Sequence, residues 1–503
     1  MSSAISRNSE RRASFAWAVL ALIVLSGSAL FFVFAHGWTL WYGDAQAHLD
    51  NARRIIDSRN PGYEQIGTVW LPIPHLLMLP LVWNMRLWQT GLAGAIPAAL
   101  GFVLAGAFLY LSARKIYASS AAGWMAMLIF ALNPNLLYLQ STPMTESVFF
   151  AALLALLWMT LRYRETNSAG ALVAAALLGM IASLTRYEGW FLIPFVTGYV
   201  LLASRRQRLL RAVLYGAIAS LGPLLWLLHN WWIYRDALAW YNGPGSAIAI
   251  QGAAHYAGQG NWALAGLYFR TVLRDVIGTV PLLIAAAGLL GVIWRRAAWP
   301  VLLLLLPPIF YIWSIHSGGL PIHIPELWPH SYYNTRYGLA ALPLIAFCAA
   351  GVMVLVPVRP RPAIVTALAI FVALPWIAPP RPDTWLCWKE SEVNSISRRA
   401  WTAQAARILE RNYRGGGILA SSGDITGIFC RAGIPLRDTV NDGNYVLWSM
   451  AVDSPVPLMR EEWVVDQAGD TLSRTMAREG GHYWLMDRVT VSGAPAVEFW
   501  RRN

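Results

Sequence analysis

The segment "WYGDAQAHLDNARR", residues 41–54, places an aspartate and a histidine four residues apart, soon after the first long apolar run of the chain. If residues 44–57 form a helix, Asp44 and His48 lie on the same face, one turn apart. A carboxylate held there can take a proton from a hydroxyl group, which makes a general base one interpretation of Asp44. The structural alternative is a helix N-cap, a role that aspartate often has. The two roles are compatible.

Further polar side chains stand in short phrases beside apolar runs, such as "STPMTESVF", "LTRYEGW" and "SYYNTRYGL". The residues in these phrases and in the first loop that can do chemistry are Glu64, Glu146, Arg186, Glu188, Tyr333 and Arg336. The planar fork of arginine suits phosphate, whereas carboxylates bind hydroxyls, cations or metal ions. Each residue also has a structural explanation, because glutamate is favourable at a helix N-terminus and arginine can extend to lipid headgroups.

Three histidines recur at intervals of seven residues, at His316, His323 and His330. Imidazole is a common zinc ligand, and so a metal site is conceivable. The surrounding segment is rich in proline and glycine, however, and has no helical register to align the three rings. We therefore favour histidines at a membrane interface over metal ligands.

Composition indicates where these residues must be held. Of 503 residues, 57% are hydrophobic and 13% are charged, compared with about 25% charged residues in a soluble domain. A membrane span needs about 20 mostly apolar residues. The chain has eleven such candidates, at 15–36, 91–112, 119–133, 147–162, 170–185, 190–204, 210–232, 276–294, 298–315, 337–357 and 362–378. The first is too long for a cleaved signal peptide and lacks a small-residue cleavage site.

The distribution of charge predicts the orientation. If the N-terminus is cytoplasmic, the inner segments hold 15 basic and 2 acidic residues, which accounts for the whole formal charge of +13. The outer loops and the tail from residue 379 are each neutral. This asymmetry follows the positive-inside rule and places the C-terminal tail outside the cytoplasm. The basic charge is thus a topology signal and does not indicate a nucleic-acid partner.

The fold class predicted is an all-α polytopic membrane domain at 1–378, followed by a small extracytoplasmic α/β domain at 379–503. Long outer loops are expected at 37–90, 233–275 and 316–336, the first containing an interfacial helix. In the tail, "TAQAARILERNY" reads as a helix, and "GGILASSG", "EEWVVDQ", "HYWLMDR" and "AVEFWRR" read as strands. Cys387 and Cys430 both fall in the tail, where a disulfide and two free thiols are equally open, while Cys348 is expected to be a core residue.

Taken together, these phrases resemble the polytopic glycosyltransferases of type C, and within them the branch of the protein O-mannosyltransferases and the lipid A aminoarabinose transferase. The similarity covers about residues 15–340 and rests on the first-loop carboxylate, "PMTE" and "TRYEG". It implies a helical core with interfacial helices and an outward cavity for a polyprenyl-phosphate sugar. The family's first-loop catalytic acid corresponds to Asp44. The mannosyltransferases usually have Asp-Glu at this point, and this chain has Asp44-Ala45, which leaves the exact branch open.

The chemistry expected of such a site is a single displacement that inverts the anomeric centre and transfers a hexosyl or pentosyl group. Asp44 would act as the general base, and His48 would orient Asp44 or meet the acceptor. The lipid phosphate leaves as an anion and needs cationic clamping, for which Arg186 and Arg336 are the candidates. The remaining assignments are donor binding for Glu64 and Tyr333, and substrate or metal binding for Glu146 and Glu188.

Two alternatives remain at this stage. Similarity to oligosaccharyltransferases would imply metal-dependent transfer of a whole glycan, with Asp44 and Glu146 as weak candidates for a divalent ion. The second alternative is a non-enzymatic transporter, although transporters usually place ionisable groups near the membrane midplane. No cofactor is established. The expected partners are a lipid-linked sugar, an envelope glycan, lipid or protein acceptor, and membrane lipids, and the expected location is a bacterial inner membrane.

Overall fold

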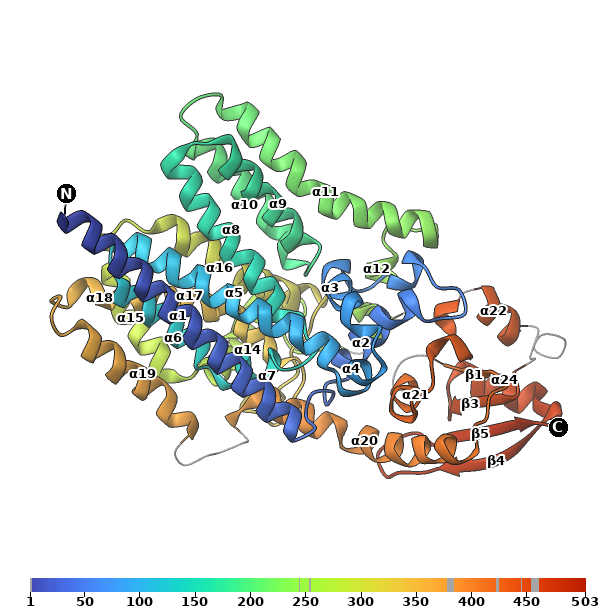
Figure 1. Ribbon diagram of the computed structural model, residues 1–503. Helices are drawn as coiled ribbons and strands as arrows, with labels where there is room; N and C mark the ends of the chain where they lie inside the picture. Colours follow the sequence, from blue (N-terminus) through green and yellow to red (C-terminus); the bar gives the residue numbers. More distant parts are fainter. Residues whose placement is uncertain are drawn as a thin grey trace. The chain divides into compact units, whose positions relative to one another are not determined.

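The computed structural model of the protein describes residues 2–243, 245–252, 255–377, 384–421, 425–444, 446–453 and 461–503 (Figure 1). The chain divides into two compact units. The first, which we call the helical unit, contains Met1–His36 and Ile96–Glu390. The second, the mixed unit, contains Gly37–Ala95 and Ser391–Asn503.

The helical unit confirms the predicted polytopic α-helical fold. Its elements are α1 (Ser2–Ala35), α5 (Leu92–Tyr117), α6 (Ser120–Ala131), α7 (Pro134–Leu139), α8 (Glu146–Thr166), α9 (Ala169–Ser183), α10 (Glu188–Ala203), α11 (Arg208–Tyr234), α12 (Ala239–Asn242), α13 (Ala247–Gln251), α14 (Trp262–Ile277), α15 (Thr279–Trp294), α16 (Ala298–Ser317), η2 (Thr335–Ala341), α17 (Leu342–Ala350), α18 (Val352–Leu355) and α19 (Arg361–Ile377). Helix α20 (Leu386–Asn412) begins here and continues into the mixed unit.

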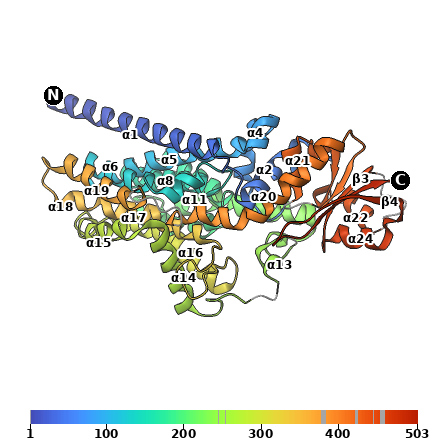
Figure 2. The same cartoon turned by 90° about the horizontal axis from the view of Figure 1, so that it is seen from below.

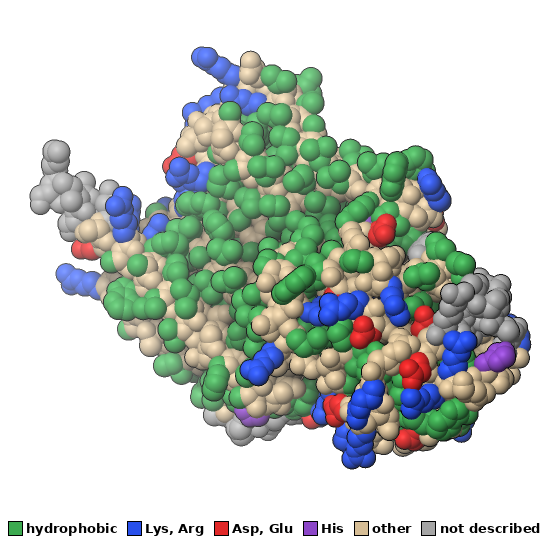
Figure 3. Space-filling model, turned by 45° about the vertical axis from the view of Figure 1, so that its right-hand side comes forward, with side chains coloured by type: hydrophobic (Ala, Val, Ile, Leu, Met, Phe, Trp, Pro, Cys, Tyr) green, Lys and Arg blue, Asp and Glu red, His purple; other side chains and the backbone are tan. Residues whose placement is uncertain are grey.

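The apolar helices identify an integral membrane protein. Among the described residues, six helices are long and apolar enough to cross a membrane, and α14 with α15 can form a seventh span that is bent by 104°. Helices α6, α9, α10 and α19 are also apolar but shorter. Every predicted span falls on an apolar helix, while the number eleven stays a prediction. Figure 3 shows a broad hydrophobic surface over the helices, as lipid contact requires.

The segment 233–275, predicted as a long outer loop, contains helices α12 and α13 and nearly all of α14. Helix α14 is amphipathic: Ala265, Tyr268, Phe269 and Val272 are buried together in a core cluster, whereas Trp262 at its start is exposed. The buried residues recur at the i, i+3, i+4, i+7 spacing of a helix face. The high proportion of polar residues in the segment before Trp262 hid this pattern.

Small residues allow close packing inside the helical unit. A Cβ atom on Gly288 of α15 would lie 2.0 Å from the carbonyl oxygen of Cys348 in α17, and one on Gly291 would lie 2.1 Å from the carbonyl oxygen of Gly351. Backbones can approach this closely only where side chains are absent, which is a common way of joining helices within membranes.

The basic residues of the predicted inner loops gather at one end of the helical unit. Arg114 donates to the carbonyl oxygen of Arg11 at 3.0 Å, and Arg295 donates to that of Tyr117 at 3.1 Å. Lys115 pairs with Glu165, which lies at the C-terminal end of α8. Glu146 begins the same helix, roughly 30 Å away along its axis. The arginine-rich segments therefore share one end, consistent with the alternation from which the topology was predicted.

The mixed unit combines two distant parts of the chain. Its elements are α2 (Gly43–Ile56), η1 (Tyr63–Ile66), α3 (Pro72–Val82), α4 (Met85–Thr90), β1 (Ile418–Ala420), α21 (Thr426–Ala432), η5 (Leu436–Asp438), β2 (Thr439–Val440), η6 (Asp442–Asn444), α22 (Val446–Asp453), β3 (Trp463–Gln467), α24 (Thr471–Glu479), η7 (Gly480–His482), β4 (Tyr483–Val489) and β5 (Val497–Arg502). The strand order is β2-β1-β3-β5-β4. Strands β1, β2 and β3 are parallel, and β5 is antiparallel to β3 and β4.

All four predicted strands are confirmed, and β2, with two residues, is one that the sequence analysis missed. Helices α22 and α24 cover one face of the sheet (Figure 2) and bury Val464 with Leu472 and Met476. On the other face Trp463 joins Leu49 and Trp88 in a second core. Residues 37–95, which the sequence analysis placed in the membrane domain, thus pack with the C-terminal residues. The domain boundary at residue 378 stays a prediction.

The three cysteines of the chain all lie among the described residues, are buried and form no disulfide. Of the two alternatives for Cys387 and Cys430, the structure therefore lacks the disulfide. Cys430 belongs to the core of the mixed unit, where it behaves as a small apolar residue. Cys348 is a core residue of α17, as predicted.

Candidate active site

Helix ends bring four of the predicted residues together in the helical unit. Glu146 is the first residue of α8 and Glu188 the first residue of α10. Both positions suit a carboxylate, because the backbone N–H groups at a helix N-terminus carry a partial positive charge. Arg186 lies in the turn between α9 and α10, and Arg336 lies in η2. Both carboxylates and Arg336 are buried.

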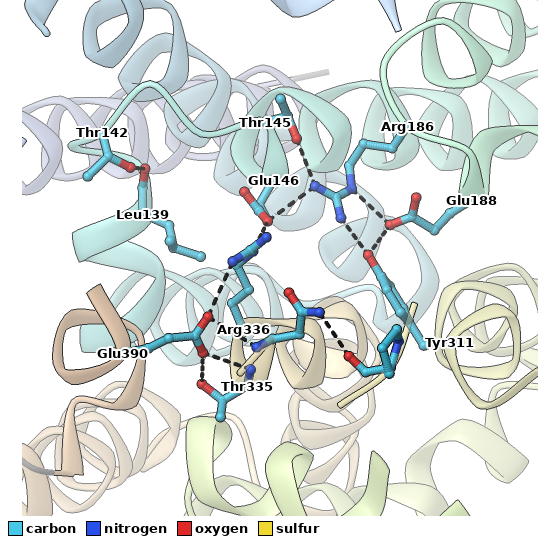
Figure 4. Close-up of polar contacts among 12 residues, drawn as sticks. Leu139, Thr142, Thr145, Glu146, Arg186, Glu188, Tyr311, Thr335, Arg336 and Glu390 are labelled. Carbon is cyan, nitrogen blue, oxygen red and sulfur yellow. Dashed lines mark hydrogen bonds and ion pairs between the residues drawn. The ribbon is translucent and has the colours of Figure 1, made fainter. Parts of the chain in front are cut away.

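Arg186 is at the centre of the first half of this network (Figure 4). Its Nη1 atom lies 2.7 Å from Thr145 Oγ1 and 3.1 Å from Glu146 Oε1. Its Nε atom donates to Glu188 Oε1 at 2.8 Å, and its Nη2 atom donates to the Tyr311 hydroxyl oxygen at 2.5 Å. The Tyr311 hydroxyl in turn donates to Glu188 Oε1. Each nitrogen atom of the Arg186 guanidinium group thus contacts an oxygen atom.

Arg336 forms the second half of the network with a residue from another part of the chain. Its Nη1 atom lies 3.2 Å from Glu390 Oε1, and its Nε atom lies 3.5 Å from Glu146 Oε1. Glu390, on α20, also accepts from the backbone N–H groups of Asn334 and Thr335 and from the Thr335 hydroxyl. Burial raises the pKa of Glu390, and the charge of Arg336 and the hydrogen bonds from Thr335 oppose that shift.

A small pocket opens beside this network. It is lined by Glu146, Arg186, Glu188, Tyr311 and Arg336 together with apolar side chains that include Phe149 and Phe150. Glu146 Oε2 is buried and has no hydrogen-bond partner. Two arginines face three carboxyl groups, so the acidic side chains of the network outnumber the basic ones by one. Such an arrangement can bind an anion only if part of the carboxylate charge moves away from the arginines.

Asp44 lies in the mixed unit, on α2. The predicted N-cap role is wrong: the N-cap position is Tyr42, which makes no side-chain cap, and Asp44 is in the first turn. The helix begins at Gly43, so the Asp44 backbone is already helical. Its partly exposed carboxylate still complements the helix dipole.

His48 lies one turn after Asp44 and is buried. Its Nδ1 atom lies 3.0 Å from Nε2 of His75, a buried residue of α3 that the sequence analysis did not select. The Trp70 ring packs against His48 with centroids 4.4 Å apart. This environment fixes the orientation of the His48 ring.

The other predicted residues lie outside the charged network. Glu64 is exposed in η1 of the mixed unit. Tyr333 is half-buried in the helical unit and stacks on Tyr256, with ring centroids 6.1 Å apart. Neither lines the pocket beside Arg186. A role in donor binding therefore stays a prediction for both residues.

The three spaced histidines have separate surroundings. His316 stacks on Trp262, His323 meets Tyr256 edge-on, and His330 contacts the carbonyl oxygen of Pro325. Within the described parts of the chain, no group of three or more His, Cys, Asp or Glu side chains is placed to hold a metal ion.

Besides the hydroxyl groups of Thr145 and Thr335, sequence analysis missed two ionisable members of the network. Tyr311 lies within an apolar run, "PPIFYIW", and nothing in that run distinguishes it from a tyrosine at a membrane interface. Glu390 stands in the charged phrase "WKESE", where the sequence gives no reason to choose it over Glu392. Only the folded arrangement identifies the pair.

Comparisons with known proteins agree with this architecture. Residues 81–232 match the family model described as dolichyl-phosphate-mannose-protein mannosyltransferase. The crystal structure of ArnT from Cupriavidus metallidurans bound to undecaprenyl phosphate is similar over 96% of this chain and 98% of that chain, with 14% identity and a TM-score of 0.57. The crystal structure of ArnT from the same organism in the apo state is similar over 97% of this chain and 98% of that chain, with 14% identity and a TM-score of 0.59. No curated protein sequence matches significantly.

The predicted resemblance is therefore confirmed: the chain has the type C fold found in ArnT, a lipid A aminoarabinose transferase, and part of it matches the mannosyltransferase family model. At 14% identity the structural similarity shows the fold.

Proposed function

We propose that this protein is a membrane glycosyltransferase that moves a sugar from a polyprenyl-phosphate donor to an acceptor hydroxyl. The observation that carries the proposal is the pair of arginines, the partly buried Arg186 and the buried Arg336, which meet at one carboxylate oxygen beside a pocket. Support comes from the shared fold of ArnT, which was solved with undecaprenyl phosphate bound. The phosphate of a membrane-anchored lipid donor is an anion, and arginines held near helix ends can bind it.

The proposed reaction assigns one task to each kind of residue. Arg186 and Arg336 stabilise the lipid phosphate as it leaves with its bonding electron pair. Asp44 takes the proton of the acceptor hydroxyl as that oxygen attacks the anomeric carbon, and the configuration inverts. The transferred group is a hexosyl or pentosyl residue. His48, held by His75, positions the first turn of α2.

The proposal also includes the setting of the reaction. The N-terminus and the arginine-rich end of the helical unit face the cytoplasm, and the acceptor is an envelope glycan, lipid or protein on the outer face of the inner membrane. A lipid donor confines the reaction to the membrane surface.

Mass spectrometry after deletion of the gene tests the function. The expected result is that one polyprenyl-phosphate sugar accumulates while the corresponding sugar disappears from an envelope acceptor. Reintroducing the wild-type gene should reverse both changes. If lipid-linked sugars and envelope glycans are both unchanged, the proposed function is wrong.

A further inference from the structure

The three carboxylates of the charged network differ in the hydrogen bonds that hold them. This difference indicates a role for the carboxylate that is held by the fewest hydrogen bonds. Glu188 accepts from Arg186 Nε at 2.8 Å and from the Tyr311 hydroxyl. Glu390 uses both oxygens, accepting from two backbone N–H groups, the Thr335 hydroxyl and Arg336. Both are fixed by neutral donors as well as by an arginine.

Glu146 is held only by the two arginines. Its Oε1 atom lies 3.1 Å from Arg186 Nη1 and 3.5 Å from Arg336 Nε, longer than the 2.8 Å between Arg186 and Glu188. Its Oε2 atom is buried without a hydrogen-bond partner. A buried carboxylate with an unused oxygen is costly to keep in place. Glu146 is therefore the member of the network that can be exchanged most easily.

The position of Glu146 Oε1 is also the position that a bound phosphate needs. It is the point where N–H groups of Arg186 and Arg336 converge, as the close-up shows (Figure 4). A phosphoryl oxygen there would accept from Arg186 Nη1 and lie within ion-pair distance of Arg336 Nε, as the carboxylate oxygen does. The phosphate and the Glu146 carboxylate cannot occupy this point together, because two anions would repel each other in a buried site.

We infer that Glu146 is a displaceable counter-ion: its carboxylate occupies the phosphate position in the empty protein, leaves when the lipid phosphate binds, and returns to help release polyprenyl phosphate. The inference rests on the proposed function and deepens it. In the empty state Glu146 occupies the point where the two arginines converge, although Glu188 and Glu390 already pair with them. After transfer, its return competes with the product for the same N–H groups, and this keeps a membrane-anchored product from blocking the site.

Binding of undecaprenyl phosphate to the full-length protein in lipid nanodiscs tests the inference. Glu146→Gln keeps the side-chain shape but removes the competing charge, so we expect about tenfold tighter binding or more. The matched control is Glu390→Gln, which changes another carboxyl group of the same network but loosens Arg336. Binding to this control should be weaker, because Arg336 is one of the two proposed phosphate ligands. In turnover assays Glu146→Gln should lower both KM and kcat, because product release becomes slow.

Glu146→Asp provides a second measurement should the Gln variant fold poorly. It keeps the charge but is one methylene too short to meet both arginines, so a smaller gain in affinity is expected. Unchanged or weaker binding in the folded Glu146 variants would overturn the inference, as would an equal gain in Glu390→Gln, which would indicate a general charge effect. A folded wild-type protein that binds no undecaprenyl phosphate would overturn the proposed function as well.

Discussion

At the scale of single residues, Asp44 gives the most direct test of the chemistry. Because Asp44 does not cap α2, Asp44→Asn should leave the fold and the thermal stability nearly unchanged. If Asp44 is the general base, turnover should fall by about 10²–10⁴-fold while undecaprenyl phosphate still binds. Steady-state rates and a binding assay on the same preparation check this. Near-normal turnover would remove Asp44 from the mechanism.

Arg186 and Arg336 permit a second test at this scale. Each guanidinium contacts at least two partners through different nitrogen atoms. Lysine keeps the charge but has a single nitrogen, so Arg186→Lys and Arg336→Lys should each raise the KM for the lipid donor by about tenfold or more. Arg274→Lys is the matched control: this exposed arginine pairs with Asp275 outside the charged network, and the variant should behave as wild type. An unchanged donor KM in both variants would make the two arginines structural.

At the scale of elements, the central strand β3 carries a buried carboxylate whose titration should affect stability. Asp466 is completely buried, its Oδ2 accepts from the Trp500 indole N–H at 3.0 Å, and its Oδ1 has no partner. Burial, together with the nearby Glu498 and Asp470, raises its pKa from 3.8 to about 7. The folded protein thus favours the protonated form. The stability that this proton provides is fully present below about pH 4 and is lost as pH rises through about 7.

Asp466→Asn removes this titration while retaining an oxygen that can accept from Trp500. The melting temperature of the variant minus that of wild type should therefore increase from pH 5 to pH 8, since only the wild type must ionise a buried acid. For each unit of pH in that range, the free energy of unfolding of the wild type relative to the variant should fall by at most about 1.4 kcal/mol. Thermal unfolding of both proteins in the same detergent at four pH values measures the difference. A constant difference would show that Asp466 does not titrate in this range.

Elements with a strong local pattern could be predicted, and those defined by distant contacts could not. The apolar helices, the continuously buried strand β3 at Trp463 and the alternating strand β5 at Phe499 follow from the hydrophobic pattern. The sharp bend between α14 and α15 depends on Gly278, whose φ of +89° other residues avoid, and the sequence analysis began the span at residue 276. Glu390 became part of the site only because α20 brings it to η2, a contact across 54 residues.

At the scale of the whole molecule, the distribution of positive charge makes a prediction that every mechanistic assignment depends on. The arginine-rich loops should face the cytoplasm and the mixed unit should face outward, because translocating short basic loops is unfavourable. The protein is well suited to cysteine labelling, since Cys348, Cys387 and Cys430 are all buried and should react little. Two exposed positions then report the two sides: Ala468, in the turn after β3, and Arg206, between α10 and α11.

In cells with a permeabilised outer membrane, an impermeant maleimide should label Ala468→Cys while the inner membrane is intact. Arg206→Cys should react only after the inner membrane is lysed, so each variant serves as the other's control. The opposite pattern would place Asp44 and the acceptor on the cytoplasmic side and would contradict the proposed outer-face reaction. Labelling of both in intact cells would show a leaky membrane, and the wild-type protein, labelled in parallel, should stay nearly unreactive because its thiols are packed in the core.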